Sequence, residues 1–122
     1  VQYSYARMQK ILKNANTSED DVAAMVREHG LEFTHIAERN LVLQLIKFEE
    51  ALTTVHKDYA PNHLVDYLLE TAKAYSRFND NCHVLKAESD SIRATRLAIV
   101  VHCKQTLGRG LNLLGIDVVP RM

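Results

Sequence analysis

Few residues in this chain break helices. Its 122 residues include four glycines, two prolines and no tryptophan. No stretch shows the alternation of Val, Ile or Thr that is typical of β-strands, and apolar residues recur three and four positions apart throughout. These patterns predict an all-α fold, an antiparallel bundle of about five helices, in one domain that covers residues 1–122.

Long apolar runs and a disulfide framework are also missing. No run approaches the roughly 18 residues of a membrane-spanning helix, so no membrane association is expected. Two cysteines, Cys82 and Cys103, are too few for a disulfide scaffold, and reduced thiols indicate a cytoplasmic protein. The chain starts at Val1, not Met, without a secretion leader and inside a helical pattern. We therefore expect a fragment of a longer polypeptide.

The chain has no excess of charge of either sign, with 15 basic and 15 acidic residues. Nucleic-acid-binding domains are usually basic, so this balance argues mildly against RNA binding. It is compatible with a domain that adds shape-specific contacts while other domains supply much of the phosphate binding.

Capping and breaking residues divide the chain into helical stretches. We expect helices at about 1–15, 19–28, 35–48, 61–80 and 89–114. A further stretch from Phe48 to Tyr59 either continues the third helix or forms its own. Ser18 or Thr17 with the following acids can cap the second helix, and Pro61 suits a first helical position. Gly108 and Gly110 are expected to weaken the last helix.

The apolar stripes predict which residues form the core. The first helix offers Val1, Tyr5, Met8, Ile11, Leu12 and Ala15. The third offers Leu41, Leu45 and Phe48. The helix that begins at Pro61 offers Leu64, Val65, Leu68, Leu69, Ala72 and Tyr75.

Tyr3 lies about 140° from the centre of the first apolar stripe, counted at 100° per residue. Arg7, Lys10 and Asn14 share its face at helical spacing. An exposed ring beside a guanidinium and an amide suits unstacked RNA bases and phosphates. The alternative is that Tyr3 packs against a neighbouring domain of a larger protein.

Three other positions depart from a simple apolar pattern. Arg96 lies within the apolar stripe of the last helix, where it either pairs with a carboxylate or contacts a phosphate at the edge of the bundle. Tyr67 and Phe78 flank the stripe of the preceding helix, and each is either a base-stacking ring or part of the core. The sequence alone does not decide between these alternatives.

No motif for catalysis or metal binding stands out. Cys82-His83 and His102-Cys103 place possible ligands next to each other, whereas zinc ligands are usually separated by two to four residues. H-E-x-x-H, G-x-S-x-G and glycine-rich phosphate loops are missing. We expect neither a metal site nor catalytic residues in this chain.

Several segments together resemble the C-terminal helical, DALR-type domain of arginyl-tRNA synthetases. The opening V-Q-Y-S-Y-A-R is similar to the family's V-Q-Y-x-x-x-R, and residues 61–69 are similar to its P-x-x-L-x-x-Y-L helix. Residues 78–85 resemble F-Y-x-x-C-x-V-L, and Thr95-Arg96-Leu97 resembles an x-R-L step. Residues 110–116 and the final Arg121-Met122 resemble G-L-x-L-L-G-I and E-R-M. The family often has Tyr where Asn79 stands and an acid where Pro120 stands, and residues 17–35 match no family segment.

The resemblance implies a tRNA anticodon-binding domain cut from a class I synthetase. It implies a parent enzyme that joins arginine to its tRNA with ATP and magnesium, whose catalytic domain lies elsewhere in the same chain. The implied partner is the anticodon stem-loop of arginine tRNA, and this fragment itself needs no cofactor. With Lys10 and Arg96, the predicted tRNA-binding residues are those that match the family: Tyr3, Arg7, Phe78, Cys82 and Met122.

Two alternatives remain at this point. The chain could be a helical protein-interaction module that binds a partner helix in an apolar groove. It could also be the equivalent domain of another class I synthetase, such as the cysteine enzyme.

Overall fold

A computed structural model describes residues 1–58, 61–84 and 86–115 of the chain, except for the side chains of residues 54–58 and 61. The helices are α1 (Gln2–Asn14), α2 (Glu19–His29), α3 (Ile36–Ile46), α4 (Phe48–Asp58), α5 (Pro61–Asn81) and α6 (Asp90–Leu113). The described part contains no strand, so the predicted all-α class is confirmed. The predicted end of the fourth stretch at Tyr59, the departure at Pro120 and the predicted tRNA contact of Met122 lie outside the described residues.

Helix ends follow the capping chemistry of the sequence. Ser18 caps α2 because its hydroxyl accepts a hydrogen bond from the backbone N–H of Asp21 at 3.1 Å. The Asp21 carboxylate accepts the Ser18 N–H in return, at 3.0 Å. Gly30 ends α2 with a φ of 76°, which favours glycine. Ser89 caps α6 by accepting from the N–H of Ile92.

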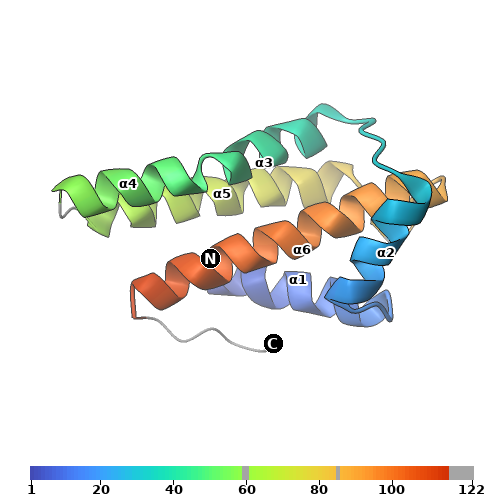
Figure 1. Cartoon of the computed structure of the whole chain (residues 1–122), viewed down its shortest axis with the longest axis horizontal. Helices are drawn as coiled ribbons and strands as arrows, with labels where there is room; N and C mark the ends of the chain where they lie inside the picture. Colours follow the sequence, from blue (N-terminus) through green and yellow to red (C-terminus); the bar gives the residue numbers. More distant parts are fainter. Residues whose placement is uncertain (59–60, 85, 116–122) are drawn as a thin grey trace.

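Only Lys47 separates α3 from α4, which settles the stretch whose continuity the sequence left open. The two are distinct helices that follow one another along the same side of the bundle (Figure 1). Counting this pair as one interrupted helix gives the predicted five.

Helix α6 lies at the centre of the bundle and packs against α1, α2, α3 and α5, while α5 also packs against α3 and α4 (Figure 1). The fully buried side chains come from α1, α3, α5 and α6, and they include Met8, Leu41, Leu68, Tyr75, Phe78, Leu97 and Leu107. The predicted core residues Leu12, Ala15, Leu45 and Phe48 are buried as well.

The predicted core stripe of α5 was partly wrong. Val65 and Leu69 are 40% and 47% exposed, whereas Tyr67 and Phe78 are buried. The reason is that α5 contacts α3 and α4 as well as α1 and α6. A helix with neighbours on several sides buries a wider arc than one stripe.

Gly110 lets α6 pack closely against α5. A Cβ atom there would lie 2.5 Å from Cδ2 of Leu68. The helix continues through both Gly108 and Gly110, so the intrinsic weakness of glycine is offset by the packing that the missing side chain allows.

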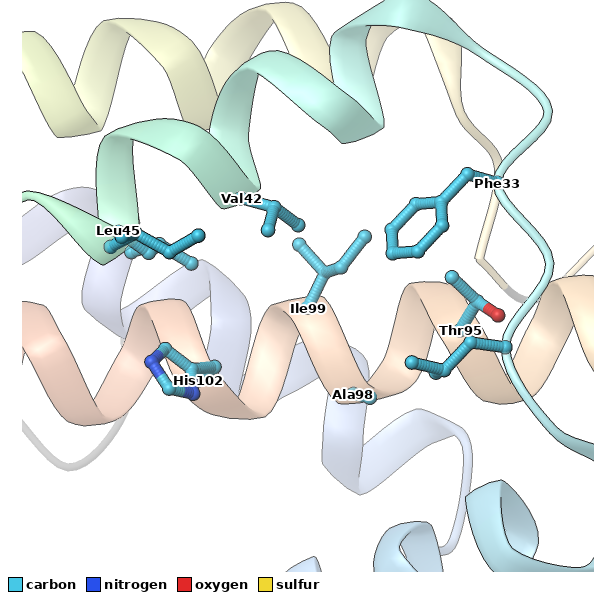
Figure 2. A pocket seen from close by; sticks show the side chains of 9 residues that line it. Phe33, Val42, Leu45, Thr95, Ala98, Ile99 and His102 are labelled. Carbon is cyan, nitrogen blue, oxygen red and sulfur yellow. The ribbon is translucent and has the colours of Figure 1, made fainter.

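Helix α3 is apolar on more than the side that faces the core. Its residues Ile36, Leu43 and Ile46 are 68%, 49% and 69% exposed. An open cavity of about 200 Å³ lies beside it, between α3, α6 and the segment 31–35 (Figure 2). We call this the apolar groove. It is lined by Leu31, Phe33, Val42, Leu45, Ile46, Thr95, Ala98, Ile99 and His102.

Candidate RNA-binding surface

One face of α1 presents the Tyr3 ring to solvent, as the sequence predicts, and Arg7 on the same face is half-buried. Tyr3 is 59% exposed. The central guanidinium carbon of Arg7, one turn later, lies 5.5 Å from the centroid of the Tyr3 ring, within cation–π range. Lys10 and Asn14 continue this face and are exposed. The opposite face is fixed because Met8 and Leu12 are buried in the core.

The charge on α1 is of one sign, although the whole chain is neutral. Its sequence, QYSYARMQKILKN, contains Arg7, Lys10 and Lys13 and no Asp or Glu. Within the described residues, no ion pair within 4.0 Å involves Arg7 or Lys10. The face therefore combines a stacking ring with cations available to phosphate oxygens, which is the chemistry that single-stranded RNA loops require.

Phe78 and Cys82, the second pair of predicted contacts, lie in the core. Phe78 has no exposed surface, and its ring centroid is 6.2 Å from that of Tyr75. Cys82 is 1% exposed, and its burial raises the pKa of the thiol. Direct contact of these side chains with RNA is not possible in this structure, so the core alternative holds for Phe78. The same is true of Tyr67, whose hydroxyl donates to the carbonyl of Gln44.

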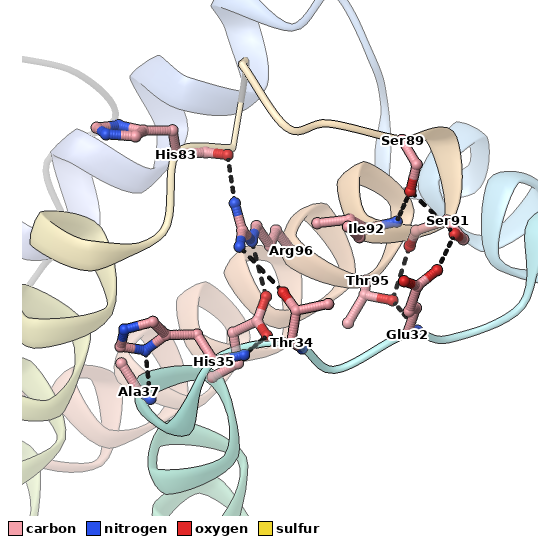
Figure 3. A network of polar contacts seen from close by, with 11 residues as sticks. Glu32, Thr34, His35, Ala37, His83, Ser89, Ser91, Ile92, Thr95 and Arg96 are labelled. Carbon is pink, nitrogen blue, oxygen red and sulfur yellow. Dashed lines mark hydrogen bonds and ion pairs between the residues drawn. The ribbon is translucent and has the colours of Figure 1, made fainter.

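Arg96 is bound within the domain. Its Nε donates to Glu38 Oε2 at 2.7 Å, and its Nη1 donates to the carbonyl of His83 at 2.9 Å (Figure 3). Nη2 also donates to the hydroxyl of Thr34. The structural alternative, a pair with a carboxylate, is therefore confirmed. Phosphate contact by Arg96 would require these bonds to break.

Glu38 is the acceptor at the centre of this network. It is fully buried, and its Oε1 accepts from the backbone N–H groups of Thr34 and His35 at 2.7 and 2.9 Å. Burial by itself would raise the pKa of the Glu38 carboxyl, but Arg96 and the two backbone donors outweigh it, so the pKa lies below its ordinary value. The pair joins α3, α6 and the segment after α5.

The family of the chain is shown by comparison with known proteins. The whole chain, residues 1–122, matches the family of the DALR anticodon binding domain. The chain belongs to this family. The DALR domain is 48% identical over its full length to the arginine–tRNA ligase of Rhodopirellula baltica and 36% identical to that of Proteus mirabilis, covering 19% and 20% of those proteins.

A solved structure agrees with the sequence relatives. The Thermus thermophilus arginyl-tRNA synthetase is 30% identical and superposes with a TM-score of 0.83, over 99% of this chain and 20% of that one. The chain thus spans about a fifth of the length of the relatives it matches.

Within the described residues of this DALR domain, no group of three or more His, Cys, Asp or Glu side chains is placed to hold a metal ion. Cys82-His83 and His102-Cys103 therefore form no such cluster there. Among the same residues, no helix is long and apolar enough to cross a membrane.

Sequence reasoning missed the partners of Arg96. Glu38 occupies the third position of α3, where a capping carboxylate accepts backbone N–H groups. That position is visible in the sequence once His35 is taken as the cap. The role of the His83 carbonyl left no signal, because a backbone acceptor does not depend on residue type.

Proposed function

We propose that this chain is the anticodon-binding domain of an arginine–tRNA ligase and that the Tyr3 face of α1 holds the anticodon stem-loop of arginine tRNA. The observation that carries the proposal is the exposed Tyr3 ring with Arg7 over it on a helix without acidic residues. Membership of the DALR family and relatives that are arginine–tRNA ligases support the choice of tRNA.

The rest of the polypeptide would carry the reaction. The proposed parent enzyme attaches arginine to its tRNA using ATP and magnesium, in a catalytic domain of the same chain and in the cytoplasm. The fragment contributes no catalytic residue to this proposal. Its neutral overall charge suits a domain that reads shape and stacking while other domains share the phosphate contacts.

We infer a division of labour among the predicted tRNA-binding residues. Unstacked bases of the loop meet the Tyr3 ring, and Arg7 and Lys10 contact phosphates or base edges. Met122 stays in the proposal as a contact at the chain end. Phe78 and Cys82 support the surface from inside the bundle.

Replacement of Tyr3 by alanine in the full-length enzyme tests the stacking contact. Stacking of a base on an aromatic ring contributes about 1–3 kcal/mol, so Tyr3→Ala should weaken binding of arginine tRNA about five- to a hundred-fold. Tyr3→Phe should keep most of the affinity because it keeps the ring. Leu69→Ala, at an exposed apolar side chain of α5, should change nothing.

Titration of labelled arginine tRNA at fixed salt measures these affinities. Equal affinity of Tyr3→Ala and wild type would remove Tyr3 from the site and favour packing against a neighbouring domain. Titration of cysteine tRNA alongside separates the arginine enzyme from the alternative class I synthetase, for which the order of affinities would reverse.

A further inference from the structure

The apolar groove differs from the α1 face in position and in chemistry. It lies between α3, α6 and the segment 31–35, whereas α1 packs mainly against α6 on the other side of the bundle (Figures 1 and 2). Its lining residues, all within the described part of the chain, include no Lys or Arg. Phosphate binding depends on such cations, so this surface suits an apolar protein segment and not RNA.

Hydrogen bonds fix the wall of the groove formed by residues 31–35. The N–H of Glu32 donates to the hydroxyl of Thr95 at 2.6 Å, and the Glu32 carboxylate accepts from Ser91 at 2.5 Å (Figure 3). Thr34 is held in turn by Glu38 and Arg96. The polar residues of this stretch thus face the α6 network.

The apolar residues that alternate with them lie at the surface of the groove. Leu31 and Phe33 are 58% and 49% exposed, and both line the groove. In Figure 2 the Phe33 ring extends toward Ile99 of α6. Because the intervening polar residues hold the backbone, a partner would meet a preformed surface and would lose little free energy in ordering it.

Helix α3 extends this surface. Seven of its 11 residues are apolar, and Ile46, which lines the groove, is 69% exposed. Ile36 and Leu43 are exposed on the same helix. A helix that is apolar on several sides is usually buried on several sides, and exposed apolar surface of this kind marks an interaction site.

We propose that the apolar groove is the docking site for an apolar segment of the same polypeptide that lies outside these 122 residues. The inference rests on the proposed function, in which this chain is one domain of a longer ligase. The relatives are about five times as long as this chain, so most of the surface that could cover the groove is outside it. Docking there leaves Tyr3 and Arg7 free for tRNA.

Cysteine labelling in the full-length polypeptide tests the docking. Ile46→Cys and Leu31→Cys introduce thiols at exposed groove positions, and Ser76→Cys introduces one at an exposed position of α5. Cys82 and Cys103 are buried and give little background. Without tRNA, maleimide should modify the groove thiols at least about tenfold more slowly than Ser76→Cys, because a covered thiol reacts only after local opening. Peptide mass spectrometry identifies the modified site.

Equal rates at all three positions would overturn the proposal, and so would equal protection at Ser76→Cys. Protection that disappears on dilution would assign the groove to a second copy of the chain, which also overturns it. Because no tRNA is present, these outcomes are independent of whether Tyr3→Ala weakens tRNA binding.

A charge placed in the groove gives a second measurement. Ile46→Lys should lower the thermal unfolding midpoint of the full-length polypeptide, since an apolar interface would have to bury an unpaired ammonium group. Leu69→Lys, on exposed α5 surface, is the matched control and should leave the midpoint unchanged. Equal midpoints for the two variants would contradict docking at Ile46.

Discussion

Two arginines of this domain have opposite surroundings. Arg7 lies on the outer face of α1 against an exposed ring, and within the described residues no carboxylate lies within ion-pair distance of it. Arg96 lies in the bundle, with a side chain that is 12% exposed and bound to Glu38 at 2.7 Å. The same guanidinium is available to a ligand in one place and is part of the scaffold in the other.

The difference shows that residues predicted from sequence as tRNA contacts can include residues with a structural role. Both arginines stand in segments that resemble the synthetase family. Only their surroundings separate a group on the side of α1, with no ion pair among the described residues, from one whose removal would leave a buried carboxylate without its cation. Variants of the two arginines can test this separation.

The largest expected effect is on stability. Arg96→Met should lower the free energy of unfolding by about 3–5 kcal/mol, because it breaks a buried ion pair and strands the Glu38 carboxylate. Arg7→Met removes a half-buried guanidinium that has no ion pair within 4.0 Å among the described residues, so it should change the free energy of unfolding much less, by about 0.5 kcal/mol. Urea unfolding followed by circular dichroism measures both. Similar losses of unfolding free energy in the two variants would contradict the different roles of Arg7 and Arg96.

Replacing both Glu38 and Arg96 tests whether the unpaired carboxylate causes the loss of stability. The double variant Glu38→Gln/Arg96→Met leaves no buried charge and keeps an amide oxygen that can accept from the N–H groups of Thr34 and His35. It should therefore be more stable than Arg96→Met alone. A double variant that is no better than the single one would mean that packing, not the stranded carboxylate, causes the loss.

A smaller effect on stability is expected from changes in pH that protonate Glu38. The pKa of Glu38 is lower in the folded chain than its ordinary value of 4.5. The stabilisation from the ionised carboxylate is therefore fully present above about pH 4.5 and is lost as the pH falls through the lower, folded-state pKa. Urea midpoints across this acid range should fall less steeply for Glu38→Gln than for wild type. Arg7→Met should follow the wild-type profile, and a flattened profile for it would contradict the assignment.

The smallest effect should appear in the salt dependence of tRNA binding. If Arg7 contacts a phosphate, Arg7→Met should reduce the slope of log affinity against log salt by about one unit. Arg109→Met is a control, because Arg109 is an exposed arginine of α6 that lies 3.4 Å from Glu49. An unchanged slope for Arg7→Met, or an equal change for both variants, would count against phosphate contact by Arg7.

Local signals predicted the helices well because their causes lie within a few residues. Ser18 and Ser89 cap the helices that follow them, and Pro61 begins α5. The break between α3 and α4 could not be placed in advance, because Lys47 carries no breaking signal of its own.

Some residues of the candidate site could be placed from local sequence patterns, whereas others depend on contacts between helices. The exposed Tyr3 face follows from helical periodicity, since the apolar stripe of α1 sets which side turns inward. Phe78 and Cys82 could not be sorted in the same way. Helix α5 has neighbours on several sides, so an aromatic residue off the main stripe still becomes buried.

By itself the sequence determined the family, the order of the helices and the outward face of α1, because motifs, caps and periodicity act over short distances along the chain. Only the tertiary structure decided that Arg96 belongs to Glu38, that Phe78 is core, and that Leu31, Phe33 and Ile46 share one groove. These facts depend on which helices lie side by side, and contacts between residues some 60 positions apart leave no periodic trace in a single sequence.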